Sequence, residues 1–135
     1  MRYRILYCLL LLAGPSLAEV AVIVNPANNA SLTESEISRL YLGKAKSFPD
    51  GAAAVPLNLA PGSAVREQFE KSVLKKSSSQ IKAYWSKLVF TGKGTPPQEV
   101  ASDAEIIAIV KSDPKSIGYV DAGAVTGDVK VIAKF

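Results

Sequence analysis

The sequence contains no histidine and a single cysteine, and these two scarcities exclude several kinds of chemistry. Without histidine there is no imidazole base, no Ser-His-Asp triad and no histidine-ligated metal. One cysteine can form neither an intramolecular disulfide nor a cysteine-based zinc site. No pair of acidic residues stands at a spacing typical of acid–base catalysis. We therefore expect a protein that is not an enzyme, with no catalytic residue, no metal and no cofactor.

Charge and length set the broad class of the protein. The chain has 135 residues, of which 48% are hydrophobic, with 16 basic and 12 acidic side chains. This composition is typical of one globular domain, and the chain is too short for two full domains. The small positive excess does not indicate a nucleic-acid partner.

Long apolar runs are confined to the first eighteen residues. A cationic lead, Met1–Arg4, is followed by the apolar stretch Ile5–Leu12 and then by small residues up to Ala18. This order is typical of a secretory signal peptide that is cleaved after Ala18. A membrane anchor is the alternative, although the run is well short of the ~20 residues that span a bilayer. We expect residues 1–18 to be a signal peptide and residues 19–135 to be the exported domain.

Hydrophobic periodicity predicts strands and helices in alternation along the exported domain. Strands are expected where apolar and β-branched residues run together, and helices where apolar residues recur every three or four positions. The predicted strands are 20–24, 53–59, 116–120 and 128–133. The predicted helices follow Thr33, Ser63 and Ser102 and run through 81–89, with a loop at 91–97. This order predicts an α/β fold with a mixed, mostly parallel sheet flanked by helices.

Local signals define the ends of these helices and part of the core. Thr33 with Glu36, and Ser102 with Glu105, have the spacing of capping boxes. Trp85 lies on the apolar stripe of the clearest amphipathic helix, so we expect it to be a core residue rather than a binding residue.

One candidate binding site lies where the second strand turns into the next helix. Pro61–Gly62 makes the turn and Ser63 stands at the N-cap position. The backbone amides of Ala64 and Val65, together with the helix dipole, favour an oxyanion at such a place, and Arg66 adds positive charge one turn on. The alternative is that Ser63 only caps its own helix.

The stretch from Arg66 to Lys93 is strongly basic, with seven basic and two acidic side chains. It is either a solvated positive face or a docking surface that attracts anions. The sequence Gly92–Thr95 within the loop is not a phosphate-binding loop, because it follows a helix and lacks the upstream glycine.

Five motifs, taken in order, resemble a known family. They are Val22–Pro26, Leu40–Lys44, Val55–Leu57, Pro61–Ser63 and Ser116–Val120. Together they resemble the phosphate-type periplasmic substrate-binding proteins of ABC transporters. The segment with Gly92–Gly94 and Pro96–Pro97 resembles that of the short, single-lobe members. The resemblance implies one lobe of a type II periplasmic-binding-protein fold and a periplasmic location. It also implies phosphate or a similar oxyanion as the ligand at Gly62–Arg66.

The ligand loop of that family, R-x-D/E-G-S-G-T-x-x-x-F, is only partly kept. Gly62, Ser63 and Phe69 match the pattern. Leu59 stands at the position of the arginine, and Ala64–Val65 stands at the position of the Gly-Thr pair. Because two strong ligands are replaced, we expect weak binding.

The resemblance leaves two functions open. The first is a periplasmic protein that binds phosphate or a related oxyanion weakly. The second is a periplasmic adaptor that docks a membrane sensor or transporter and binds no small molecule. Because the second lobe is missing, we also expect a partner at the open face, and a homodimer would bring two Ser63 turns together. That face is expected to carry Asn25–Pro26 as well, since both segments follow the carboxyl ends of strands.

Overall fold

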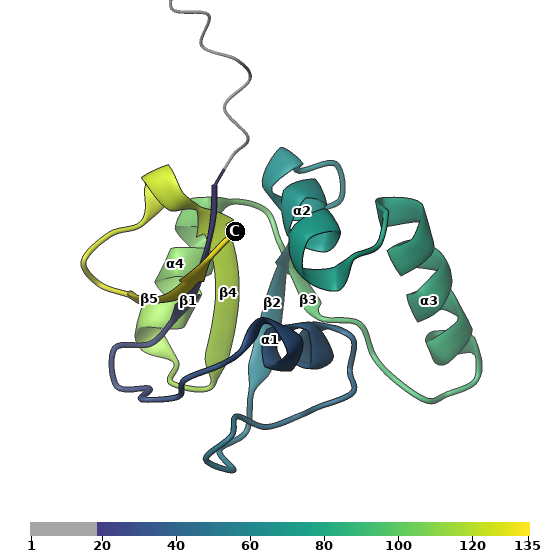
Figure 1. Ribbon diagram of the computed structural model, residues 1–135, viewed down its shortest axis with the longest axis horizontal. Coiled ribbons are helices and arrows are strands. Elements are labelled where there is room, and N and C mark those ends of the chain that lie inside the picture. The colour runs from purple at the N-terminus through teal and green to yellow at the C-terminus, as the bar shows by residue number, and fades with distance from the viewer. Residues whose placement is uncertain (1–18) are drawn as a thin grey trace, which may run out of the picture.

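A five-stranded sheet forms the centre of residues 19–135, the part of the chain that the computed structural model describes (Figure 1). Its strands are β1 Val20–Val24, β2 Val55–Leu59, β3 Gln98–Val100, β4 Ser116–Asp121 and β5 Lys130–Lys134, in the spatial order β3-β2-β4-β1-β5. β2 is parallel to both β3 and β4, whereas β1 is antiparallel to both β4 and β5. Four strands therefore share one direction and β1 is reversed, which confirms the predicted mixed sheet, with two parallel and two antiparallel pairings.

The reversal of β1 corrects one expectation about the open face. Val20 pairs with Asp121 and Val24 pairs with Ile117, so β1 ends where β4 begins. Asn25–Pro26 therefore lies at one end of the strands and the turn after β2 lies at the other end. The expectation that the two segments share one face was wrong. The rule on carboxyl ends applies only to strands that run the same way.

Helices cover both faces of this sheet (Figure 1). They are α1 Glu34–Tyr41, α2 Ala64–Phe69 with its π-helical continuation η1 Glu70–Leu74, α3 Ser78–Phe90 and α4 Asp103–Ser112, and a 3-10 turn, η2 Ala122–Ala124, precedes β5. On the face of α1 and α2, Tyr41 and Phe69 pack against Tyr119 of β4. On the other face, Ile106 of α4 lies against Gly118. Successive residues of β4 thus point into different layers, as the pleat of a strand requires.

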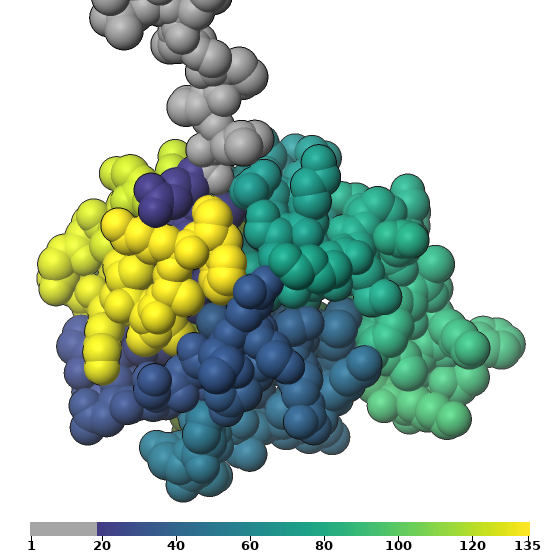
Figure 2. Space-filling view, in the orientation of Figure 1, coloured from purple at the N-terminus to yellow at the C-terminus, as the bar shows by residue number. Residues whose placement is uncertain are grey.

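Helix α3 lies beside these layers and buries only part of its apolar stripe. Ile81 and Trp85 are buried, Tyr84 and Leu88 are half-buried, and Val89 is 53% exposed. The predicted amphipathic helix and the core position of Trp85 are confirmed, but the C-terminal end of the stripe is not core. This part of the chain projects at the right of Figure 2, in green.

One of the two predicted capping boxes forms. Thr33 and Glu36 exchange both hydrogen bonds at the start of α1. At the start of α4, Ser102 Oγ accepts from the Glu105 N–H, but the Glu105 carboxylate accepts from the N–H of Ala101 instead of Ser102. The prediction of a second capping box was therefore wrong, because the hydrogen bond from the Ser102 N–H to Glu105 does not form. The helix nevertheless begins where it was expected.

Periodicity did not predict the edge strand β3. It pairs in parallel with Leu57–Leu59, and two of its three residues are polar and exposed, so it has no hydrophobic pattern of its own. The strand predicted over 53–59 begins later, at Val55, because Ala53 forms an isolated bridge with Ser47.

The predicted signal peptide, residues 1–18, lies outside the described residues. Within residues 19–135, no helix has the length and apolar character that crossing a bilayer requires.

Candidate functional site

The turn between β2 and α2 has the geometry that the sequence predicts. Gly62 adopts a left-handed φ of +87°, a conformation that residues with a side chain rarely take. Ser63 then caps α2, because its Oγ accepts from the Arg66 N–H at 3.2 Å and its carbonyl accepts from the Glu67 N–H at 3.0 Å. The N-cap interpretation of Ser63 is therefore confirmed, and its hydroxyl proton can still be donated outward.

The first turn of α2 offers backbone donors to solvent. The N–H groups of Ala64 and Val65 come too early in the helix to have an intrahelical acceptor. Ala64 is exposed and Val65 is half-buried. An oxyanion in front of this turn would meet these two amides and the hydroxyl of Ser63.

Arg66, in contrast, is directed toward the end of β2 and is held there. Its guanidinium donates to the Leu59 carbonyl at 2.8 Å, and only 14% of its side chain is exposed. Arg66 Nε lies 3.6 Å from a Glu70 carboxylate oxygen, and Arg66 Nη1 lies 3.7 Å from a Glu99 oxygen. One cation thus faces two carboxylates, and this cluster carries a net charge of −1. Arg66 is therefore already paired with protein groups.

These acidic partners of Arg66 were not identified from the sequence. Glu70 follows Arg66 by four residues, a spacing that brings two side chains together on a helix and could have revealed the pair. Glu99 lies on β3, the strand that periodicity did not predict, so no sequence signal placed it near Arg66.

A buried hydrogen-bond network supports the turn from beneath. The Tyr119 hydroxyl donates to the Asn58 side chain and accepts from the Leu59 N–H at 3.2 Å. Burial raises the pKa of Tyr119 well above its usual range, while the hydrogen bond from Leu59 and the charge of Arg66 offset part of this rise. The phenol therefore stays protonated and fixes the end of β2, from which the turn departs.

The acidic residues do not gather into a metal site. In residues 19–135, no group of three or more Asp and Glu side chains is placed to hold a metal ion.

Comparison with known proteins identifies the fold. No family model and no curated protein matches the chain. Among solved structures, an ABC-type phosphate transport receptor from Vibrio cholerae matches 86% of the chain with a TM-score of 0.67 and 20% identity. The chain has the fold of these receptors. PstS from Borrelia burgdorferi matches 78% of it with a TM-score of 0.57 and 19% identity.

A third structure with the receptor fold, from Clostridium perfringens, was solved with bound phosphate, and it matches 86% of the chain with a TM-score of 0.67 and 20% identity. The chain spans 46%, 45% and 42% of the Vibrio, Clostridium and Borrelia proteins, which is less than half of each. The predicted fold, a single lobe of a periplasmic binding protein, is therefore confirmed. At this level of identity the likeness is one of fold.

Proposed function

We propose that the chain is an exported, noncatalytic periplasmic protein that binds phosphate or a related oxyanion weakly at Gly62–Arg66. The observation that carries this proposal is the exposed first turn of α2, where Ser63, Ala64 and Val65 present donors in front of the left-handed Gly62. The fold likeness to phosphate transport receptors supports the same ligand class.

The charges around Arg66 limit the affinity. Three charge-assisted hydrogen bonds of about 1.5–3 kcal/mol each act against an association cost of at least ~4 kcal/mol. The remainder is at most about 5 kcal/mol, so the affinity for phosphate is near millimolar at best. The carboxylates of Glu70 and Glu99 oppose an incoming anion, and Arg66 is already engaged by both.

An NMR titration with phosphate tests the proposal. The amide signals of Ser63, Ala64 and Val65 are expected to shift and to saturate at millimolar phosphate. Replacing the half-exposed Glu99 by glutamine removes an opposing charge. The Glu99→Gln variant is therefore expected to bind phosphate about two- to fivefold more tightly, as a surface charge worth ~0.5–1 kcal/mol allows.

A matched control for this titration is Glu105→Gln, which removes an exposed carboxylate from α4 and leaves the turn intact. It is expected to leave the phosphate affinity unchanged. If saturating phosphate moves none of the three amides, the turn is only a helix cap and the oxyanion proposal is wrong.

The second candidate function is an adaptor that docks a membrane sensor or transporter. It is favoured by the pairing of Arg66 within the protein and by the apolar side chains at the end of α3, where Val89 is 53% and Phe90 is 92% exposed. An adaptor that binds other proteins does not require Arg66 to be available for an anion at the turn. A homodimer at the turn is a further proposal, which the charges of Glu70 and Glu99 would oppose.

Export has its own test. Cleavage after Ala18 predicts that the protein recovered from the periplasm begins at Glu19 by mass spectrometry. A membrane-associated product that keeps residues 1–18 would contradict the signal-peptide prediction and would favour the anchor.

A further inference from the structure

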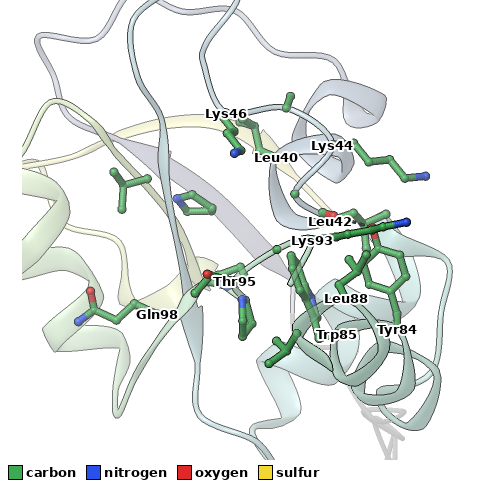
Figure 3. A pocket seen from close by; sticks show the side chains of 18 of the residues that line it. Leu40, Leu42, Lys44, Lys46, Tyr84, Trp85, Leu88, Lys93, Thr95 and Gln98 are labelled. Carbon is green, nitrogen blue, oxygen red and sulfur yellow. Dashed lines mark hydrogen bonds between the residues drawn. The ribbon is translucent and has the colours of Figure 1, made fainter. Parts of the chain in front are cut away.

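A concavity separate from the Gly62–Arg66 turn opens between the end of α1 and α3, and we name it the α1–α3 groove (Figure 3). Its volume is about 900 Å³. Its accessible apolar surface includes Val55 and Val89, which are 41% and 53% exposed, and the half-buried Leu88, while the buried Trp85 lies beneath them. The groove does not include any residue of the Gly62–Arg66 turn.

Close packing and a hydrogen bond join the two sides of the groove, which are α3 and the end of α1. Gly43 ends α1 with a left-handed φ of +71°, and a Cβ there would lie 2.9 Å from the indole of Trp85. A Cβ on Gly94 would lie 3.3 Å from the same ring. The Tyr84 hydroxyl donates to the Leu42 carbonyl at 2.6 Å. The packing of Trp85 on Gly43 and the hydrogen bond from Tyr84 to Leu42 tie α3 to the end of α1, and the contact with Gly94 holds the loop after α3 against the same indole.

The charge that borders the groove has one sign. Lys44, Lys46 and Lys93 line it, and no aspartate or glutamate does. All three lysines are exposed, and within residues 19–135 none of them takes part in an ion pair. In Figure 3 the amino groups of Lys44 and Lys93 extend toward the right of the view, and that of Lys46 lies at the left. The groove therefore combines an apolar lining with a charge of +3, which suits an occupant that is both apolar and acidic.

Strand addition at this groove is blocked by the sequence of β2. β3 pairs only with Leu57–Leu59, so the first two residues of β2 lie at an open edge. Pro56 has no N–H, and the Val55 N–H donates to the Lys115 carbonyl at 2.8 Å. A proline at an open edge prevents a further strand from pairing there. An occupant therefore does not extend the sheet at Val55–Pro56, and the side chains of the groove are left as its main means of recognition.

We propose that the α1–α3 groove binds a short acidic segment of a partner protein, with apolar side chains on the lining and carboxylates on Lys44, Lys46 and Lys93. A concave site with its apolar surface between lysines fits a peptide better than the flat surface of a membrane. This inference deepens the adaptor function and does not depend on oxyanion binding at the turn.

Trp85 makes the proposal directly measurable, because it is the one tryptophan of the sequence and it lines the groove. The probe is a twelve-residue peptide of alternating glutamate and leucine, added to the exported protein. We expect a saturable shift of the Trp85 emission. The same peptide with lysine in place of glutamate is expected to cause no shift.

Two triple variants with equal loss of charge locate the binding. Lys44→Gln/Lys46→Gln/Lys93→Gln is expected to weaken binding of the acidic peptide at least tenfold. The matched control, Lys111→Gln/Lys115→Gln/Lys134→Gln, removes three exposed lysines that do not line the groove and is expected to change it less than twofold. Equal weakening in both variants would overturn the proposal, because binding would then follow net charge alone.

Two further experiments distinguish peptide binding in the groove from binding to a membrane surface and from oxyanion binding at the turn. Vesicles containing phosphatidylglycerol are expected to leave the Trp85 emission unchanged, and a shift with vesicles but not with the peptide would overturn the proposal in favour of a membrane surface. Phosphate shifts at Ser63–Val65 are expected to be the same in the groove variant as in the wild-type protein. No peptide response alongside intact phosphate shifts would overturn the groove inference and leave the oxyanion proposal standing.

Discussion

At the residue scale, two buried tyrosines replace missing backbone pairing between β2 and β4. The ladder between these strands covers only Val55 and Pro56 on the side of β2. Beyond it, the Tyr41 hydroxyl lies 2.8 Å from the Leu57 carbonyl, and the Tyr119 hydroxyl accepts from the N–H of Leu59. Because buried backbone groups need partners, these phenols hold together strands that have begun to separate.

The same tyrosines predict a loss of stability in alkali. Burial raises the pKa values of Tyr41 and Tyr119 above the ordinary tyrosine value, which is about 10 in an unfolded chain. Below pH ~10 both states hold these protons and the stabilisation is complete. As the pH rises above ~10, the unfolded chain releases protons that the folded chain keeps, so the free energy of unfolding falls.

Urea unfolding at several pH values measures this effect. The Tyr41→Phe/Tyr119→Phe variant is expected to be less stable at pH 7 by about 1–3 kcal/mol for each hydroxyl, because buried backbone groups lose their partners. Its stability is also expected to fall less steeply than that of the wild type between pH 9 and pH 11. Equal slopes for the two proteins would contradict the assignment of the alkaline loss to these tyrosines.

At the element scale, features that neighbouring residues determine could be predicted from the sequence. Features that depend on contacts between distant segments could not. The cap at Thr33 and the left-handed Gly62 are set by neighbouring residues, so the first helix and the candidate turn were predictable. The existence of β3 and the reversal of β1 depend on pairing with distant strands, so no local pattern revealed them. The pairing of Arg66 with Glu99 was missed for the same reason.

The close contact between β4 and α4 at Gly118 can be tested by adding one methyl group, with the substitution Gly118→Ala. A Cβ at Gly118 would lie 2.6 Å from Cγ2 of Ile106, so Gly118→Ala forces the helix and the strand apart. Overpacking of this kind costs about 1–3 kcal/mol. Urea unfolding is expected to show that loss, and a smaller loss when Gly118→Ala is made in an Ile106→Ala background, where the opposing methyl group is absent.

Gly123→Ala is the matched control for this substitution. The nearest atoms to a Cβ at Gly123 are the carboxylate oxygens of Asp121, at 3.9 and 4.0 Å. The substitution is expected to change stability by less than about 0.5 kcal/mol, as is usual at the surface. Equal losses for Gly118→Ala in the wild-type and Ile106→Ala backgrounds would show that Ile106 is not the group that clashes.

At the scale of the whole molecule, the two candidate surfaces have opposite charge. The cluster of Arg66, Glu70 and Glu99 next to the turn carries −1, whereas the α1–α3 groove carries +3. Trp85 lines the groove, and it also lines a separate hollow between α2 and α3 whose border includes Gly62 and Arg66. Helix α3 thus stands between two surfaces of opposite charge, which favour different partners.

This distribution of charge predicts how a homodimer at the turn would behave. A two-fold pairing through Gly62–Ser63 would bring two clusters of Arg66, Glu70 and Glu99 together, and like charges of −1 would repel. The screening length of surface charges falls from about 8 Å at physiological ionic strength to about 3 Å at 1 M salt, so added salt weakens this repulsion. Such a dimer is therefore expected to gain stability with added salt and in the Glu99→Gln variant. Sedimentation velocity at micromolar concentration, with and without phosphate, measures this, and a monomer under all these conditions would exclude a clamp built from two copies of the turn.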